Sequence, residues 1–198
     1  MVFNKLIDNK TVALVGNAQS LFDYQYGSEI DDHDVVIRIN DTAIYYDNNR
    51  HSHGSRNTIW AFWDVLKFIT SQKQYRGPRT DEFFSSGKYH KLNLLGANAD
   101  RAFELDDVEF GSDIKRKCKK ELGNPSAGSI LLYLLNEYNP RWVTVYGMDF
   151  KRTKTFSHEY NNVDNQRYDS FYRHNFKFEE EYAKQKYFSQ ERFVIKGN

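Results

Sequence analysis

Two histidines near the C-terminus have neighbours suited to proton transfer. His158 opens the segment His-Glu-Tyr-Asn, and His174 opens His-Asn-Phe-Lys-Phe-Glu, which ends at Glu179. A histidine titrates near neutral pH, so either ring could act as a general acid or base. Each also has a plain structural explanation. His158 could be a surface-loop residue beside a glutamate, and His174 could be packed among aromatic side chains.

Two turns of small residues could hold a nucleotide phosphate. Gly16-Asn17 directly follows an apolar run at 12–15, and the turn after the first strand of an α/β unit often holds a phosphate. Ser126-Ala127-Gly128 opens another apolar segment, where the free N–H groups of a helix start would attract an anion. The competing explanations are an ordinary βαβ turn and a helix packed tightly on a sheet. Gly16 stands alone, so the G-x-G-x-x-G pattern is absent.

The acidic cluster Asp31-Asp32-His33-Asp34 could in principle bind Mg²⁺ or Mn²⁺. It lies just before the apolar run at 35–39, so helix capping and turn formation explain it better. His51 and His53 have no third ligand nearby and are interpreted as loop residues. The sequence therefore predicts no metal site.

The elements that must position these residues are short apolar runs that alternate with helical segments. Strands are predicted at 11–15, 35–39, 57–62, 91–95 and 143–146. Helices are predicted at 18–24, 64–71 and 112–122, and from Pro125, with Asn124 as its N-cap, to a stop at Asn139-Pro140. The segment 97–110 is interpreted as acidic and irregular. Buried β-branched strands alternating with helices predict a parallel sheet.

Length and composition predict one domain over residues 1–198, with room for a substantial core. The net charge of +1 creates no global field that favours nucleic acid or membrane. No apolar run is long enough to span a bilayer, and the first ten residues are too polar for a signal peptide. A single cysteine, Cys118, excludes an internal disulfide, so a cytoplasmic location is predicted.

The order of these residues resembles that of the eukaryotic sialyltransferase family. Residues 11–41 contain Gly-Asn-x-x-Ser-Leu and then Ile-Asp-Asp-His-Asp-Val-Val-Ile-Arg-Ile-Asn, which is similar to sialyl motif L. Residues 123–150 contain Asn-Pro-Ser-Ala-Gly-Ser and end Val-Tyr-Gly-Met-Asp-Phe, which is similar to motif S. Within 158–179, the two histidine segments resemble motifs III and VS. The four motifs lie in the family's order.

The resemblance implies a Rossmann-like α/β fold of the GT-A-variant type, with a mostly parallel sheet flanked by helices. It implies transfer of sialic acid or a related sugar from a CMP-sugar donor to an acceptor hydroxyl of a glycan or another molecule, with inversion and without a metal or other cofactor. His158 would stabilise the leaving phosphate, and His174 would deprotonate the acceptor. Independently of the resemblance, if residues 170–186 form a helix, Glu179 lies five residues after His174 and not quite on the same face, so we expect it to fix local structure rather than to pair with His174. The donor site would be lined by Asn17, Asn40, Ser126 and Gly128.

Some features depart from the family. Its paired cysteines are missing, because residue 11 is Thr and 123–150 contains no cysteine. No membrane anchor or stem is expected from the sequence, and the chain is short beside the family's catalytic domains. A bacterial or phage-encoded cytosolic relative would fit these departures.

Three alternatives stay open. The chain could be a relative that binds a nucleotide or sugar without turnover, or a glycosyltransferase that uses another nucleotide sugar. It could also act on nucleic acid through the basic residues within 115–120, although the near-neutral charge and an ordinary solvated helix face argue against this.

Overall fold

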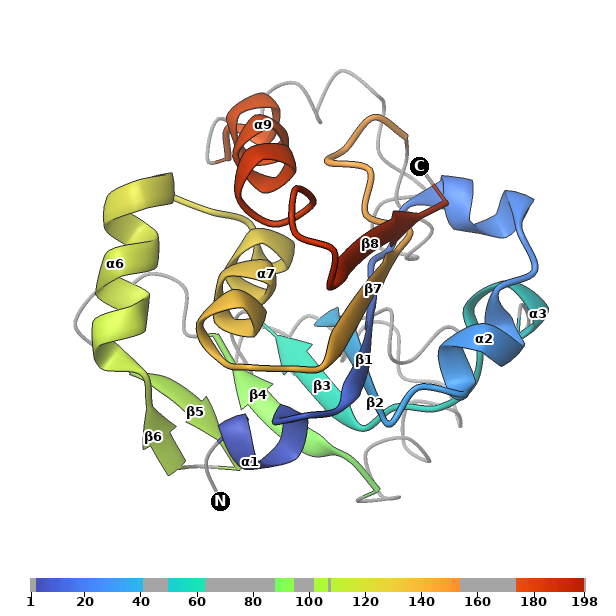
Figure 1. The fold of residues 1–198 in the computed structure, drawn as a ribbon, viewed down its shortest axis with the longest axis horizontal. Coiled ribbons are helices and arrows are strands. Elements are labelled where there is room, and N and C mark those ends of the chain that lie inside the picture. Colours follow the sequence, from blue (N-terminus) through green and yellow to red (C-terminus); the bar gives the residue numbers. More distant parts are fainter. Residues whose placement is uncertain are drawn as a thin grey trace, which may run out of the picture.

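The computed structural model describes residues 3–40, 50–62, 88–94, 102–106, 108–153 and 174–197, and a single sheet of eight strands runs through these ranges (Figure 1). Its strands are β1 (Thr11–Val15), β2 (Val35–Ile39), β3 (Ile59–Phe62), β4 (His90–Asn93), β5 (Phe103–Leu105), β6 (Val108–Phe110), β7 (Trp142–Tyr146) and β8 (Phe193–Lys196). Their spatial order is β6-β5-β4-β3-β2-β1-β7-β8. All neighbours pair in parallel except β4–β5 and β5–β6. The mostly parallel α/β sheet is therefore confirmed.

Helices cover both faces of the sheet (Figure 1). They are α1 (Phe3–Ile7), the 3-10 helix η1 (Gln19–Asp23), α2 (Gly27–Asp31), α3 (Arg50–His53), α6 (Ser112–Leu122), α7 (Ala127–Glu137) and α9 (Phe176–Lys186). Figure 1 shows α6, α7 and α9 on one side, and α2 and α3 on the other. Within the described ranges, no helix combines the length and apolarity needed to cross a bilayer.

The central strand β1 is buried on both faces, as a strand inside a parallel sheet must be. Its alternate side chains, Val12 and Leu14, pack in the cluster that contains the apolar residues of α7 and α9. Ala13 and Val15 point the other way and pack with Leu21 and its neighbours from η1 and α2. A continuous apolar run, rather than an alternating one, is the sequence pattern that this position requires.

The strand order reverses at β1, which lies between β2 and β7. In such sheets the carboxyl ends of the strands border a crevice where ligands bind. Here the turns that follow β1 and β7 touch through their backbones: the Gly16 N–H donates to the Tyr146 carbonyl at 2.8 Å, and the Ala18 N–H donates to the Gly147 carbonyl at 3.0 Å. A Cβ on Gly16 would lie 2.3 Å from the Gly147 carbonyl oxygen, so only glycine fits there.

Several predicted elements differ from the observed ones. The segment interpreted as irregular contains the β5–β6 hairpin, and the segment with His51 and His53, which was interpreted as loop, contains α3. The sequence did not predict the last strand, β8. The prediction of a helix at 64–71 lies outside the described residues. Helix α7 begins at Ala127 with Ser126 as its N-cap, so the predicted cap at Asn124 is wrong.

Candidate active site

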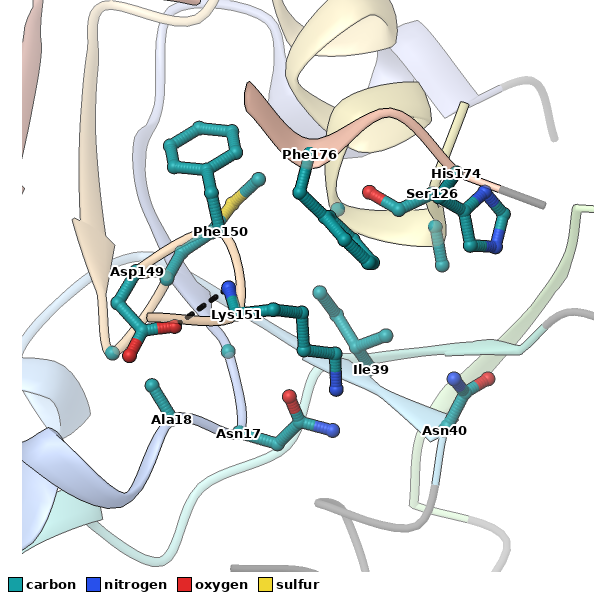
Figure 2. Close-up of a pocket in the computed structure, with 15 residues that line it drawn as sticks. Asn17, Ala18, Ile39, Asn40, Ser126, Asp149, Phe150, Lys151, His174 and Phe176 are labelled. Atoms are coloured by element: carbon teal, nitrogen blue, oxygen red, sulfur yellow. Dashed lines mark hydrogen bonds between the residues drawn. The ribbon is translucent and has the colours of Figure 1, made fainter. Parts of the chain in front are cut away.

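A cavity of about 210 Å³ lies at the carboxyl ends of β1, β2 and β7 (Figure 2). Five of the residues singled out in the sequence line this cavity: Asn17, Asn40, Ser126, Gly128 and His174. The remaining predicted site residue, His158, lies outside the described residues. The structure thus brings residues from both ends of the chain to one place, while their chemical roles stay predictions.

Two asparagines border the cavity from the ends of neighbouring strands. Asn17 follows the Gly16 turn of β1 and is half-buried. Asn40 follows β2 in the left-handed region, with φ of 49°, a conformation that asparagine adopts more readily than most residues. Its carbonyl accepts a hydrogen bond of 2.7 Å from the indole Nε1 of Trp60, which fixes the backbone there. Two amide groups, each able to donate and accept, therefore face one space (Figure 2).

The start of α7 is held by a buried carboxylate from α9. Glu179 is 2% exposed, and its Oε2 accepts from the hydroxyls of Ser126 at 2.6 Å and Ser129 at 2.5 Å. The Ser126 N–H also points to both carboxylate oxygens, at 3.2 Å each. Ser126 serves as the cap because its hydroxyl lies between the Ser129 N–H and Glu179. The expectation that Glu179 fixes local structure is confirmed.

The small residues of the first turn of α7 serve packing as well as access. A Cβ on Gly128 would lie 2.7 Å from the Cε of Met148, so the space that a side chain would need is already occupied by that methionine. Tight packing therefore accounts for Gly128. The backbone of Ala127 and Gly128 still lines the cavity, where the first N–H groups of a helix have no acceptor within the helix.

His174 lies just before α9 and is oriented by a backbone carbonyl. Its Nδ1 is 2.8 Å from the Asn124 carbonyl oxygen. A carbonyl only accepts, so Nδ1 carries the hydrogen, and in the neutral ring Nε2 is the basic nitrogen. The ring also contacts Phe176, with centroids 5.6 Å apart. His174 is thus both packed against an aromatic ring and held in one tautomer at the cavity.

Sequence reasoning missed the turn that follows β7. The Asp149 side chain is 5% exposed, and its carboxylate accepts from the N–H groups of Lys151 at 3.0 Å and Thr153 at 2.7 Å, and from the Thr153 hydroxyl. Phe150 and Lys151 are both left-handed, with φ of 52° and 67°. Figure 2 shows the Lys151 side chain running toward Asn17 and Ile39. The sequence did offer one signal for this turn: it follows a predicted strand of the parallel sheet, and the carboxyl ends of such strands often border a ligand site.

The acidic cluster before β2 has a structural role, as the sequence favours, but its carboxylates hold distant backbone segments instead of capping a helix. The Asp31 carboxylate accepts from the N–H groups of Ser55, at 2.8 and 2.9 Å, and Arg56, at 2.8 Å. Asp34 accepts from the N–H of Thr11 at 2.8 Å and from its hydroxyl at 2.9 Å. Among the residues that the structure describes, no three His, Cys, Asp or Glu side chains gather as metal ligands. Metal independence stays a prediction.

The histidine pair interpreted as loop belongs instead to α3, and His53 is buried. Burial, together with the nearby positive charge of Arg38, lowers the pKa of His53 to about 4. The ring lies against Phe22, with centroids 5.8 Å apart. His53 is therefore a neutral core residue near neutral pH.

Comparisons with known proteins agree with this architecture. Residues 6–87 match the model of glycosyltransferase family 29 (sialyltransferase). That match includes the first predicted motif and ends before the other three. No curated protein sequence matches the chain significantly.

Solved structures share the fold over nearly all of the chain. A mammalian sialyltransferase in complex with Gal-beta-1-3GalNAc-ortho-nitrophenol matches with a TM-score of 0.55 and 16% identity, over 98% of this chain and 71% of that one. A second mammalian sialyltransferase structure matches with a TM-score of 0.53 and 18% identity, over 94% of this chain and 68% of that one. The chain therefore shares the fold of these sialyltransferases, and its first part is similar to glycosyltransferase family 29.

Proposed function

We propose that the chain transfers sialic acid or a related sugar from a CMP-sugar to an acceptor hydroxyl, with inversion and without a metal, and that His174 is the general base. The acceptor oxygen attacks the anomeric carbon of the donor and loses its proton to Nε2 of His174. The bond between the anomeric carbon and the phosphate oxygen breaks, and its electron pair leaves with CMP. The products are the glycosylated acceptor and CMP.

One observation carries this proposal. The hydrogen bond of 2.8 Å from Nδ1 of His174 to the Asn124 carbonyl makes Nε2 the basic nitrogen, on the wall of the cavity that Asn17 and Asn40 also line. A general base needs a fixed tautomer and a place within reach of the acceptor hydroxyl. The amides are suited to reading a ribose or a cytosine edge. His158 is proposed to assist the leaving phosphate.

A substitution that removes the base and keeps its hydrogen bond tests the proposal. In His174→Asn, the side-chain amide can still donate to the Asn124 carbonyl, but no basic nitrogen remains. We expect a loss of transfer of about 100-fold or more, because general-base catalysis contributes about 10²- to 10⁴-fold. CMP affinity, measured by calorimetry with EDTA present, should stay within a few-fold. His90→Asn is the control, since His90 pairs with Asp106 away from the cavity.

The outcomes separate the proposal from its alternatives. CMP binding by the wild type without transfer to any acceptor in a broad screen would favour a nucleotide-binding relative. Binding of UMP that requires Mn²⁺ would favour a different donor class. Transfer that survives in His174→Asn would remove the assigned base, and transfer to a modified base in DNA would identify a nucleic-acid acceptor.

A further inference from the structure

We propose that Lys151 binds an anionic oxygen of the donor and supplies the positive charge that this site needs. The inference rests on the proposed function, because the anion is the phosphate or the sugar carboxylate of a CMP-sugar. The sequence resemblance placed the donor site at the small-residue turns and gave Lys151 no role. The charges around the cavity indicate why a lysine is required there.

The start of α7 does not by itself attract an anion strongly. A helix N-terminus carries the equivalent of about half a positive charge. The Glu179 carboxylate lies at this same helix end, where the N–H and hydroxyl of Ser126 and the hydroxyl of Ser129 donate to it. Its full negative charge more than offsets the helix dipole locally. A donor phosphate beside Ala127 and Gly128 would therefore be repelled unless a cation lies close by.

Lys151 is placed to be that cation. It lines the same cavity as Gly128 and His174, and its side chain is half-buried. Among the described residues that line the cavity, it is the only lysine or arginine. Figure 2 shows the side chain running across the space between the turn after β7 and the end of β2, toward Asn17 and Ile39. A lysine ammonium offers three donors to an anion as a compact charge.

The backbone that presents Lys151 is built to hold this direction. Two consecutive non-glycine residues, Phe150 and Lys151, are in the left-handed region, a conformation that costs free energy and persists only where other contacts enforce it. Those contacts come from Asp149, whose carboxylate accepts the N–H groups of Lys151 and Thr153. The Asp149 carboxylate also lines the cavity, but its oxygens accept these backbone N–H groups, and the lysine side chain runs away from it across the cavity (Figure 2).

The reaction would use this charge as the donor bond breaks. When the electron pair moves to the phosphate oxygen, the negative charge on CMP grows, and a fixed cation stabilises that change. If Lys151 contacts the sugar carboxylate instead, it would orient the donor but would not stabilise the negative charge that grows on the phosphate. Both contacts have the same chemistry, and binding measurements distinguish them.

The test is calorimetry of wild type and Lys151→Gln with cytidine, CMP and CMP-N-acetylneuraminic acid. A phosphate contact predicts that the substitution weakens CMP binding by about 10- to 100-fold, the range for a charge-assisted hydrogen bond, and leaves cytidine binding unchanged. A carboxylate contact predicts weaker binding of CMP-N-acetylneuraminic acid only. Lys151→Arg, which keeps the charge, should restore most of the affinity in either case.

Lys177→Gln is the matched control, because Lys177 is an exposed residue of the nearby α9 that does not line the cavity. Unchanged affinity of Lys151→Gln for all three ligands, with wild-type binding intact, would overturn this inference alone. A wild type that binds none of the ligands would overturn the proposed function and this inference with it. Equal weakening by Lys177→Gln would show a diffuse field instead of a contact at Lys151.

Discussion

Two buried carboxylates hold the walls of the cavity, and they act over very different lengths of chain. Glu179, in α9, binds the N-cap residue of α7 and a residue of its first turn, which lie 53 and 50 positions earlier. Asp149 binds backbone groups only two and four residues ahead in its own turn. One carboxylate joins two helices, and the other closes a single turn.

The difference teaches how the two walls depend on the rest of the fold. His174 lies at the start of α9 and contacts Asn124 before α7, so its position relies on the packing that Glu179 secures. Lys151 is positioned by its neighbours in sequence. The wall that carries His174 should therefore fail together with the fold, whereas the wall that carries Lys151 should fail alone.

The largest expected effect is from Glu179→Ala. It removes the acceptor of three buried or half-buried donors, each costing about 1–3 kcal/mol when left unsatisfied. We expect the free energy of unfolding, measured with urea, to fall by about 3 kcal/mol or more. Glu181→Ala is the control, because Glu181 is an exposed residue of the same helix and its loss should cost less than about 1 kcal/mol. Equal losses from the two variants would break the comparison.

The buried His53, which does not line the cavity, makes the stability of the whole fold depend on pH, and this can be compared with the effects of the two carboxylates. The pKa of His53 is lowered to about 4 from its ordinary value of 6.5, so the unfolded chain binds more protons between these pH values. The contribution of neutral, buried His53 to the free energy of unfolding is therefore fully present above pH 6.5 and is lost as the pH falls toward 4. We expect this histidine to remove about 2 kcal/mol between pH 8 and pH 5. Urea unfolding of wild type and His53→Gln at both pH values isolates the effect, and identical pH dependence would contradict it.

A smaller change in stability is expected from Asp149→Ala. Its turn lies near the surface, where water can reach the released N–H groups, so we expect a loss of about 1 kcal/mol. CMP affinity should nevertheless fall several-fold, because Lys151 would lose its fixed direction. Thr153→Ala, which removes only one of the donors, should change affinity less. A large loss of stability with unchanged CMP binding would reverse the roles assigned to the two carboxylates.

The smallest effect is the coupling between residues, measured by double-mutant cycles of unfolding free energy. Glu179→Ala and Ser129→Ala should be coupled by about 1 kcal/mol, because their side chains are hydrogen-bonded at 2.5 Å. Asp149→Ala and Ser129→Ala share no contact among the described residues and should be additive within about 0.5 kcal/mol. Coupling of similar size in both pairs would show that the two walls are not independent.

The sequence was sufficient for the central strands because their apolar runs are uninterrupted. The runs at β1, β2 and β7 are buried on both faces, a pattern that few other structures produce. The hairpin of β5 and β6 was missed because three-residue strands are too short to show a period. The cap of α7 was placed too early because Ser126 gains a partner, Glu179, that lies far away in sequence.

The cavity was only partly accessible to sequence reasoning. Asn17, Asn40, Ser126 and His174 were found through motif order, and the structure brings them to one cavity. Lys151 was not, because its direction depends on two successive left-handed residues that no local propensity favours. Phe176 was expected only as an aromatic packing partner of His174, and its place in the lining of the cavity depends on where α9 begins.

The backbone contact between the turns of Gly16 and Gly147 has a consequence for anyone who wishes to change the donor that this fold accepts. With 2.3 Å between an added Cβ and a carbonyl oxygen, the floor of the cavity offers no side chain to vary. Libraries that randomise the floor would mostly yield unfolded variants. Lys151 and Phe176 line the same cavity with side chains that can be replaced. Selectivity for a new ligand would therefore be engineered at these two side chains, with the contact between the two glycine turns left untouched.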